Sequence, residues 1–426
     1  MLGRLLLGSL VMMLSVQSFA FGEWEFSGFA SIGAGKLDQK DVRYIDFDDE
    51  WSMYSDSVLG LQAQVELSDR WSFITQVVAN GYNYTDNDPF TPNLEWFVFG
   101  YQLNANTQLR VGRFRAPQYR YSTTLEVGYT YQWVRPSQNA YPLFFSPFRG
   151  VDGIDISHNT SYGDVDVGYQ FLIGTTGGKY EGTEVDAELA YGGNIIASWS
   201  NFSARISAQE FVISVEFPGF APLVAGYEAF AGIHSADANA EAALRLIPES
   251  FSTNSQDVSY MSLGFTYEID RWTLATEILN LRSENRNFAN DADGYYISAA
   301  YQFNEFSPYI MIGEYHNRFS DDIKNKVIAS ESVSSIAPGG TLAIGDDNLT
   351  LDQLRAQTIA TFQFFNVDQE TLTLGLRYDF HPKADIKFEV EYFNFLNGSY
   401  GNFYPDEITE KGDTAILTSF VIDVVF

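Results

Sequence analysis

Long stretches in which apolar and polar residues alternate limit most strongly what this chain can fold into. In residues 165–174, Val165, Phe171 and Ile173 alternate with polar residues such as Asp166. Successive side chains of a strand point to opposite faces, so such a segment has one apolar face and one largely polar face. Similar segments extend over about 10 to 12 residues, which exceeds the average soluble strand and matches a tilted strand that crosses a bilayer. They lie at 59–67, 295–303, 372–380 and 385–392.

The alternating segments predict sixteen strands. They lie at 23–35, 57–67, 71–82, 94–103, 107–115, 151–160, 164–174, 188–199, 202–215, 258–269, 272–283, 294–303, 307–317, 370–380, 384–396 and 414–426. Thr358–Phe365 also has the pattern of a strand, but it would make the number odd, so we place it in the long loop 318–369, as a hairpin arm or an extension. An even number returns the chain to its starting side, as in outer-membrane barrels.

Connections between these strands differ in length on the two sides. Seven short turns alternate with eight long, irregular segments, at 36–56, 83–93, 116–150, 175–187, 216–257, 284–292, 318–369 and 397–413. Hydrocarbon cannot satisfy unpaired backbone groups, so the strands must close without edges. We therefore expect an all-β fold, a transmembrane antiparallel β-barrel of about 16 strands around an aqueous lumen.

Both chain ends agree with export to an outer membrane. Residues 1–20 contain Arg4, an apolar run and small residues before a cut after Ala20, which is the pattern of a signal peptide. The barrel then occupies 21–426, where no segment is apolar enough for a spanning helix. The last strand ends on Phe426 and resembles the C-terminal assembly signal of Gram-negative outer-membrane barrels. We expect membrane lipid and lipopolysaccharide as partners.

Composition argues against several other functions. The net charge of −30, from 55 acidic and 25 basic residues, would repel nucleic acid. The chain has no Cys, which excludes disulfides and cysteine-bound metal. Its four histidines lack metal-ligand spacing, and no nucleophile or phosphate-binding motif occurs. We therefore expect no catalytic residues, no metal site and no cofactor, and a protein that is not an enzyme.

One region has the opposite charge. Between Trp96 and Val151 the only acid is Glu126, yet six arginines lie there: Arg110, Arg113, Arg115, Arg120, Arg135 and Arg149. The segment 116–150 is also rich in Tyr and Phe, which do not favour a loop exposed to water. We expect this loop to fold into the pore as a constriction where the arginines attract anions. The alternative is that the arginines pair with carboxylates of the barrel wall or with lipid phosphate.

Strand alternation conflicts with one part of this interpretation. If Leu109 and Val111 face outward, then Arg113 and Arg115 face outward as well. Either a bulge follows Gly112, as glycine in a strand suggests, or this part of the wall faces a neighbouring subunit. Arg110 faces the lumen in either case.

The arginine region also resembles a known family. Leu109–Pro117, Glu126–Tyr129 and Trp133–Pro136 resemble the fifth strand and inward loop of Gram-negative porins, including the phosphate-selective-like branch. Gly375–Pro382 is similar to their penultimate turn. The resemblance implies a homotrimeric diffusion channel with an arginine-lined eyelet. No lysine lies between Lys40 and Lys179, so the lysine cluster associated with phosphate selectivity is missing.

The expected function is passive diffusion of small hydrophilic solutes or ions through an outer-membrane channel that prefers anions. A cation preference is the main alternative, because the chain is acidic and alternation points carboxylates inward, namely Glu66, Asp166, Glu389 and Glu391. A barrel hydrolase without an open pore is a second alternative. A third is a surface-binding or adhesion barrel that works through 216–257 and 318–369. The sequence does not identify the solute.

Overall fold

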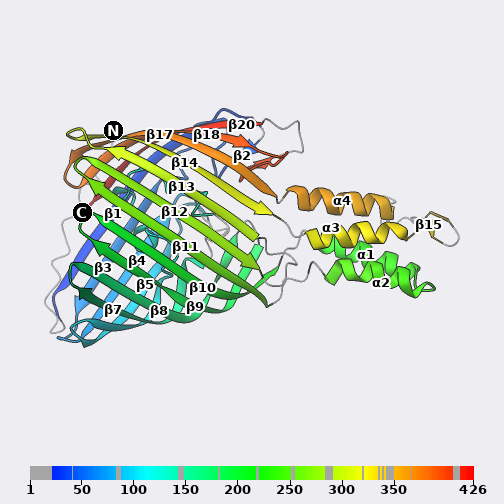
Figure 1. Ribbon diagram of the computed structural model, residues 1–426, viewed down its shortest axis with the longest axis horizontal. Coiled ribbons are helices and arrows are strands. Elements are labelled where there is room, and N and C mark those ends of the chain that lie inside the picture. Colours follow the sequence, from blue (N-terminus) through cyan, green and yellow to red (C-terminus); the bar gives the residue numbers. More distant parts are fainter. Residues whose placement is uncertain are drawn as a thin grey trace, which may run out of the picture.

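The structure is a computed structural model, and its main feature is one closed antiparallel barrel (Figure 1). It describes residues 22–40, 42–82, 88–142, 148–180, 183–216, 220–249, 251, 255–283, 291–318, 321–333, 336–337, 340–341, 350–364, 366–405 and 413–426. The predicted signal peptide, residues 1–20, lies outside the described residues.

Sixteen strands form the barrel, so the predicted fold class is confirmed. They are β1 (Trp24–Leu37), β3 (Val58–Glu66), β4 (Trp71–Asn80), β5 (Pro92–Asn104), β6 (Thr107–Arg115), β7 (Gly150–Tyr162), β8 (Val165–Tyr180), β9 (Thr183–Trp199), β10 (Phe202–Glu216), β11 (Gln256–Ile269), β12 (Trp272–Ser283), β13 (Asp291–Tyr301), β14 (Phe306–Arg318), β17 (Val367–His381), β18 (Ala384–Phe395) and β20 (Thr414–Val425).

The apolar side chains that alternation predicted to face outward do so. Phe171 and Ile173 of β8 are both 55% exposed, while Leu172 between them is buried. The same pattern recurs around the wall, where Leu374 and Phe388 are exposed and Thr373 and Glu389 are buried. An exposed apolar outer face on a closed sheet is the surface that a bilayer requires.

The barrel closes where β1 pairs with both β3 and β20. Each strand otherwise pairs with its neighbours along the chain, so all barrel hairpins are antiparallel. At the closing seam, Gly28 and Phe426 exchange two backbone hydrogen bonds of 2.9 Å. The Phe426 ring also covers Gly28, where a Cβ atom would lie 2.5 Å from the ring. The last residue therefore completes the hydrogen bonding of the seam.

Three expectations about the long segments are wrong. Strands β8 and β9 extend into 175–187, a segment expected to be a loop. The segments 216–257 and 318–369 are not irregular, because they contain α1 (Ala221–Ile233), α2 (Ala238–Glu249), α3 (Asp321–Ala329) and α4 (Leu351–Phe364). Thr358–Phe365, expected as a hairpin arm or an extension, lies largely in α4.

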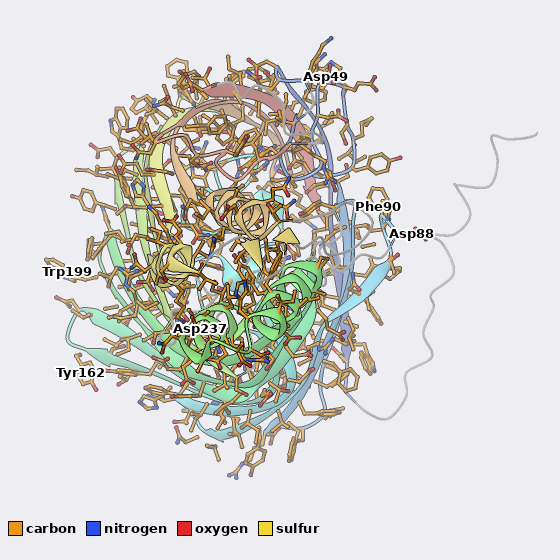
Figure 2. All side chains as sticks on the ribbon, turned by 90° about the vertical axis from the view of Figure 1, so that its right-hand side faces the viewer. Asp49, Asp88, Phe90, Tyr162, Trp199 and Asp237 are labelled. Carbon is orange, nitrogen blue, oxygen red and sulfur yellow. The ribbon has the colours of Figure 1, made fainter. Side chains whose placement is uncertain are left out.

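The four helices form a bundle beyond one end of the barrel (Figure 1). We call this the loop end, and the opposite end, with the short turns, the turn end. Helix α1 contacts α2 and α4, and α3 contacts α2 and α4. The bundle has its own buried core, which includes Leu223, Tyr227, Phe230, Leu244 and Leu354. Figure 2 looks onto the loop end and shows the helices over the area that the strands enclose.

Capping residues and apolar spacing explain why these segments are helical. Asp237 accepts hydrogen bonds from the N–H groups of Asn239 and Ala240 at the start of α2. Thr350 and Gln353 bond each other reciprocally at the start of α4, as in a capping box. No helix among the described residues is long and apolar enough to cross a membrane.

The remaining elements are short. At the loop end of the barrel, β2 (Val42–Arg43) pairs with β19 (Tyr404–Pro405). At the far end of the helical bundle, β15 (Ile336–Ala337) pairs with β16 (Gly340–Thr341) (Figure 1). Single 3-10 turns occupy Ser122–Thr124, Gly128–Thr130 and Ser330–Ser332. The first two belong to the segment between β6 and β7.

Deletion of Phe426 is expected to impair assembly, because it removes two hydrogen bonds, worth about 1 kcal/mol each, from the seam that closes the barrel. The measurement is the yield of folded barrel, seen as the band that shifts on heating in SDS gels. Tyr162→Ala, which removes an exposed aromatic ring away from the seam, should leave this yield unchanged. Equal yields from the deletion variant and the wild type would contradict the role of Phe426.

Candidate functional site

The segment between β6 and β7 lies inside the barrel. The Nε1 of Trp133 donates to Ser298 Oγ at 2.9 Å, and its ring packs edge-on against Tyr296 of β13. One buried cluster joins aromatic residues of this segment to the wall from β9 to β17. The segment members are Tyr119, Tyr131, Trp133, Ala140, Tyr141 and Phe148. We call the described part of 116–150, residues 116–142 and 148–150, the inner loop. Its contacts with the wall place it inside the barrel, as expected.

Side chains of the wall hold the backbone of the inner loop. Lys387 Nζ donates to Gly128 O at 2.6 Å, and Arg377 Nη1 donates to the carbonyl oxygens of Tyr129 and Tyr131 at 3.0 and 2.8 Å. Hydrogen bonds to charged donors are stronger than neutral ones. The loop is therefore attached to β17 and β18 through main-chain atoms, independently of its side chains.

Arg135 is the most heavily paired arginine of the loop. Its guanidinium lies 2.7 Å from Asp56, contacts Glu391, lies 3.7 Å from Glu389 and donates to Ser419 Oγ at 2.6 Å. The side chain is only 8% exposed. Three carboxylates around one cation leave this group with a formal surplus of negative charge. The loop residue thus joins β18 and β20 to the segment before β3.

A second charged group lies at the C-terminal end of β6. Arg115 pairs with Glu95 and Glu126 at 2.7 Å each, and Arg149 pairs with Glu126 at 3.2 Å. Burial raises the pKa of the Glu126 carboxyl, but Arg115 and Arg149 outweigh it and hold the pKa below its ordinary value. Glu126 therefore stays ionised at neutral pH, and the two arginines are neutralised by two carboxylates.

Arg110 points into the lumen, as alternation predicted, and it is also paired. Its Nε donates to Asp155 Oδ1 at 2.9 Å, and Gln170 donates to the same carboxylate at 2.7 Å. The guanidinium lies between the rings of Trp96 and Phe114, 5.8 and 5.6 Å from their centroids. Its charge is thus balanced within the wall.

Arg113 does not belong to the constriction, which corrects the prediction. It pairs with Asp152 at 2.8 Å on the outer face, and both side chains are about half exposed. Pairing between β5 and β6 is regular from Leu109 to Arg113, so there is no bulge at Gly112 itself. The bulge lies in β5 instead, where Glu95 is the extra residue between Leu94 and Trp96.

Arg120 differs from the other arginines of the loop. Its backbone N–H donates to Glu277 Oε2 at 2.9 Å, while its guanidinium lies over the Tyr121 ring. Among the described residues no carboxylate lies within ion-pair distance of its side chain. Of the six arginines that the sequence singled out, four form ion pairs inside the barrel, one lies on the outer face, and Arg120 has no ion pair within the described chain.

A cavity of about 120 Å³ remains beside the inner loop. Its lining comes from loop residues and from the wall around β1, β3, β4 and β20, the side opposite the aromatic cluster. The ionisable side chains in the lining, apart from tyrosines, are Asp56, Glu126, Asp423, Arg135 and Arg149. Within the described residues, no group of His, Asp and Glu is placed to hold a metal ion.

Sequence reasoning missed several wall residues that position the loop. Glu277 accepts hydrogen bonds from Tyr141 and from Tyr296, the latter at 2.9 Å. Lys387 is fully buried between Asp385 and Asp423 and reaches the loop as described above. Charged residues on the inward face of long strands are the only sequence signal for such roles, and they do not reveal the partner.

Replacement of Arg135 by Ala is expected to destabilise the barrel by about 3–5 kcal/mol, because it leaves Asp56, Glu389 and Glu391 buried without their cation. The measurement is the denaturant or temperature midpoint at which the folded band is lost. Arg245→Ala, which breaks an exposed pair with Glu241, should change stability by less than about 1 kcal/mol. Equal effects of the two changes would show that the Arg135 group does not stabilise the fold.

Comparison with solved structures shows the same fold. An anion-selective porin from Comamonas acidovorans matches with a TM-score of 0.53 and 10% identity, over 95% of this chain and 100% of that one. OmpT of Vibrio cholerae matches with a TM-score of 0.51 and 12% identity, over 96% of this chain and 99% of that one. The outer membrane channel DcaP of Acinetobacter baumannii matches with a TM-score of 0.51 and 11% identity, over 96% of this chain and 99% of that one.

Sequence comparison identifies the family. No curated protein sequence matches the chain. The family model described as Gram-negative porin matches residues 9–320, which is more than half of the chain. The chain therefore belongs to the Gram-negative porins and is a channel protein of the outer membrane.

Proposed function

We propose that small hydrophilic solutes and ions diffuse passively through the cavity between the inner loop and the wall at β1, β3, β4 and β20. The observation that carries this proposal is the polar cavity that the inner loop leaves on one side of the barrel. The aromatic residues of the loop pack against β9 to β17, and its carbonyl groups are held by β17 and β18. The opposite side keeps a cavity lined by charged and polar groups.

The size and lining of this cavity favour small, hydrated solutes. Its volume of about 120 Å³ has room for several water molecules, because about 10–15 Å³ of such space is enough to hold one. Its polar lining includes Ser31, Ser57 and Asn80 besides the charged groups. Passage needs only that a solute exchange hydration water for such groups, which requires no bond chemistry. The proposal therefore includes the absence of enzymatic activity.

We further propose that the channel prefers cations. The prediction of anion preference rested on unpaired arginines, but Arg110, Arg115, Arg135 and Arg149 are each paired with carboxylates. The lining contains three carboxylates against two guanidinium groups, and one of the three, Asp423, also pairs with the buried Lys387. Glu391 lies behind Arg135 as a further carboxyl group. Fixed charges at the narrowest point decide ion selection, because charges farther away are screened.

Conductance in planar bilayers tests whether the protein is a channel. The reversal potential across a salt gradient tests whether the channel prefers cations or anions. We expect discrete conductance steps and a reversal potential that favours cations. Asp56→Asn should reduce this preference, because it removes one carboxylate of the lining while Glu389 and Glu391 still pair with Arg135.

A matched control for this experiment lies on the helical bundle. Glu228→Gln removes the same charge from an exposed position of α1 and should leave the reversal potential unchanged. An anion-selective wild type would contradict the proposed cation preference. A barrel that inserts without conducting would contradict the channel itself and would favour the adhesion alternative, for which the projecting bundle is the supporting feature.

We also propose a homotrimer in which the outer wall at β5, β6 and β7 contacts neighbouring copies. Arg113 and Asp152 lie there in an outward groove lined by Leu94, Phe97, Val111 and Ile154. A lone Arg facing lipid at the bilayer midplane costs about 2–4 kcal/mol, which a neighbouring subunit would relieve. Elsewhere the apolar outer face contacts lipid and lipopolysaccharide.

Native mass spectrometry in detergent is expected to show a trimer. Asp152→Arg should lower the trimer fraction, because it places two like charges side by side in the groove. Asp166→Arg, an equal change at an exposed position near the turn end, should not. A wild type that is only monomeric would contradict the proposed assembly.

A further inference from the structure

A polar site lies where the start of the inner loop contacts the wall at β10 and β11. Pro117 O accepts hydrogen bonds from Ser207 Oγ at 2.6 Å and from Arg205, both on β10. Gln118 O accepts from Ser262 Oγ of β11 at 2.7 Å and from Tyr260 OH at 3.2 Å. Two successive carbonyl groups are thus fixed against β10 and β11. The side chains around them are almost completely buried.

Arg205 brings a charge into this site without a carboxylate to balance it. Its side chain donates to the Pro117 carbonyl, it is 8% exposed, and its Nη1 has no hydrogen-bond partner. Within the described chain, no acid lies within ion-pair distance of it. This contrasts with Arg110 and Arg135, which are paired directly with carboxylates. A buried charge without a counter-charge is strongly unfavourable, so the site requires one.

Further buried donors on neighbouring residues of the loop and of β10 also lack partners. Gln118 is fully buried and Gln209 is 2% exposed, and in both amides neither the oxygen nor the nitrogen is hydrogen-bonded. Gln209 follows Arg205 and Ser207 on the inward face of β10 and lies opposite Tyr260 in the register. The Nε of Arg120 is a further unpartnered buried donor. The unsatisfied groups are therefore mainly N–H donors around a cation.

The nearest acid, Glu277, is engaged elsewhere. Its Oε1 accepts from Tyr296 at 2.9 Å and from Tyr141, and its Oε2 accepts the backbone N–H of Arg120. Arg120 and Arg205 together with Glu277 give a net charge of +1. One monovalent anion would neutralise this group, whereas a divalent oxoanion would overcompensate it and would lose more hydration on burial.

We propose that this site binds a small monovalent anion such as chloride, between Arg205, Gln209 and the first turn of the inner loop. The anion accepts hydrogen bonds from the Nη1 of Arg205 and from the two glutamine amides. Arg120, which is half-buried, forms the lumen side of the site and admits the ion. The bound anion acts as a structural counter-ion that fixes the inner loop to β10 and β11, separate from the cavity proposed for solutes.

A chloride titration of the folded barrel in detergent tests the site. Ionic strength is held constant with gluconate, which is too large to enter. We expect the unfolding midpoint of the wild type to rise with chloride and then saturate. Gln209→Leu removes one donor and should weaken the apparent chloride affinity by about ten-fold, as for the loss of one hydrogen bond to a charged group.

Gln209→Glu is the decisive variant, because it supplies a carboxylate beside Arg205 from the chain itself. It should fold and lose the chloride response. Gln302→Glu, the same change at an exposed position, should keep that response. In crystals grown with bromide, we expect an anomalous peak within hydrogen-bond distance of Arg205.

Two results would overturn the proposal. One is a midpoint that does not respond to chloride in the wild type. The other is an equal response in the wild type and in Gln209→Glu, since the groups would then bind water alone. Both readouts are independent of conductance, so failure of this site is distinguishable from failure of the proposed channel.

Discussion

Satisfaction of backbone hydrogen bonds in hydrocarbon is the constraint on which the rest of this structure depends. A lipid-exposed sheet edge would leave N–H and C=O groups unpaired, so the sixteen strands must close through β1 and β20. Closure places every second side chain in an interior too wide for those side chains to fill. The inner loop occupies part of that interior, and its aromatic residues complete a core with one side of the wall. The remaining side keeps polar surface and the cavity.

The same constraint decides what the arginines do. Inside a barrel covered by a loop, a guanidinium is mostly shielded from water, so each one needs a counter-charge. Arg135 meets Asp56 and Glu391, which are far from it in sequence but adjacent in space. Arg115 and Arg149 share Glu126. A local surplus of positive charge along the sequence therefore becomes a nearly neutral set of ion pairs in the fold, and the field in the cavity depends on the carboxylates that remain.

The sequence was sufficient for those features that depend on local periodicity. The outward face of Phe171 and Ile173 and the inward position of Arg110 follow from alternation alone, and the number of strands follows from alternation together with the even count that a barrel requires. Pairing between distant residues does not, which is why Asp155 and Glu391 were not identified as partners of Arg110 and Arg135. The helices were missed for a different reason. The capping residues Asp237 and Thr350 were visible in the sequence, but an all-β interpretation gave them no weight.

The helical bundle shows where the membrane constraint ends. Beyond the loop end, water can satisfy backbone groups, so the chain no longer needs sheet pairing and can use helices with an apolar stripe. Leu223, Tyr227 and Phe230 form such a stripe on α1, and Tyr227 OH lies 3.1 Å from Thr358 Oγ1 on α4. That contact joins the segment after β10 to the segment after β14, whose attachment points are separated along the barrel rim by β12 and β13. The bundle has a core of its own and lies over the loop end, while the strands below it pair with their neighbours as in the rest of the barrel (Figure 2).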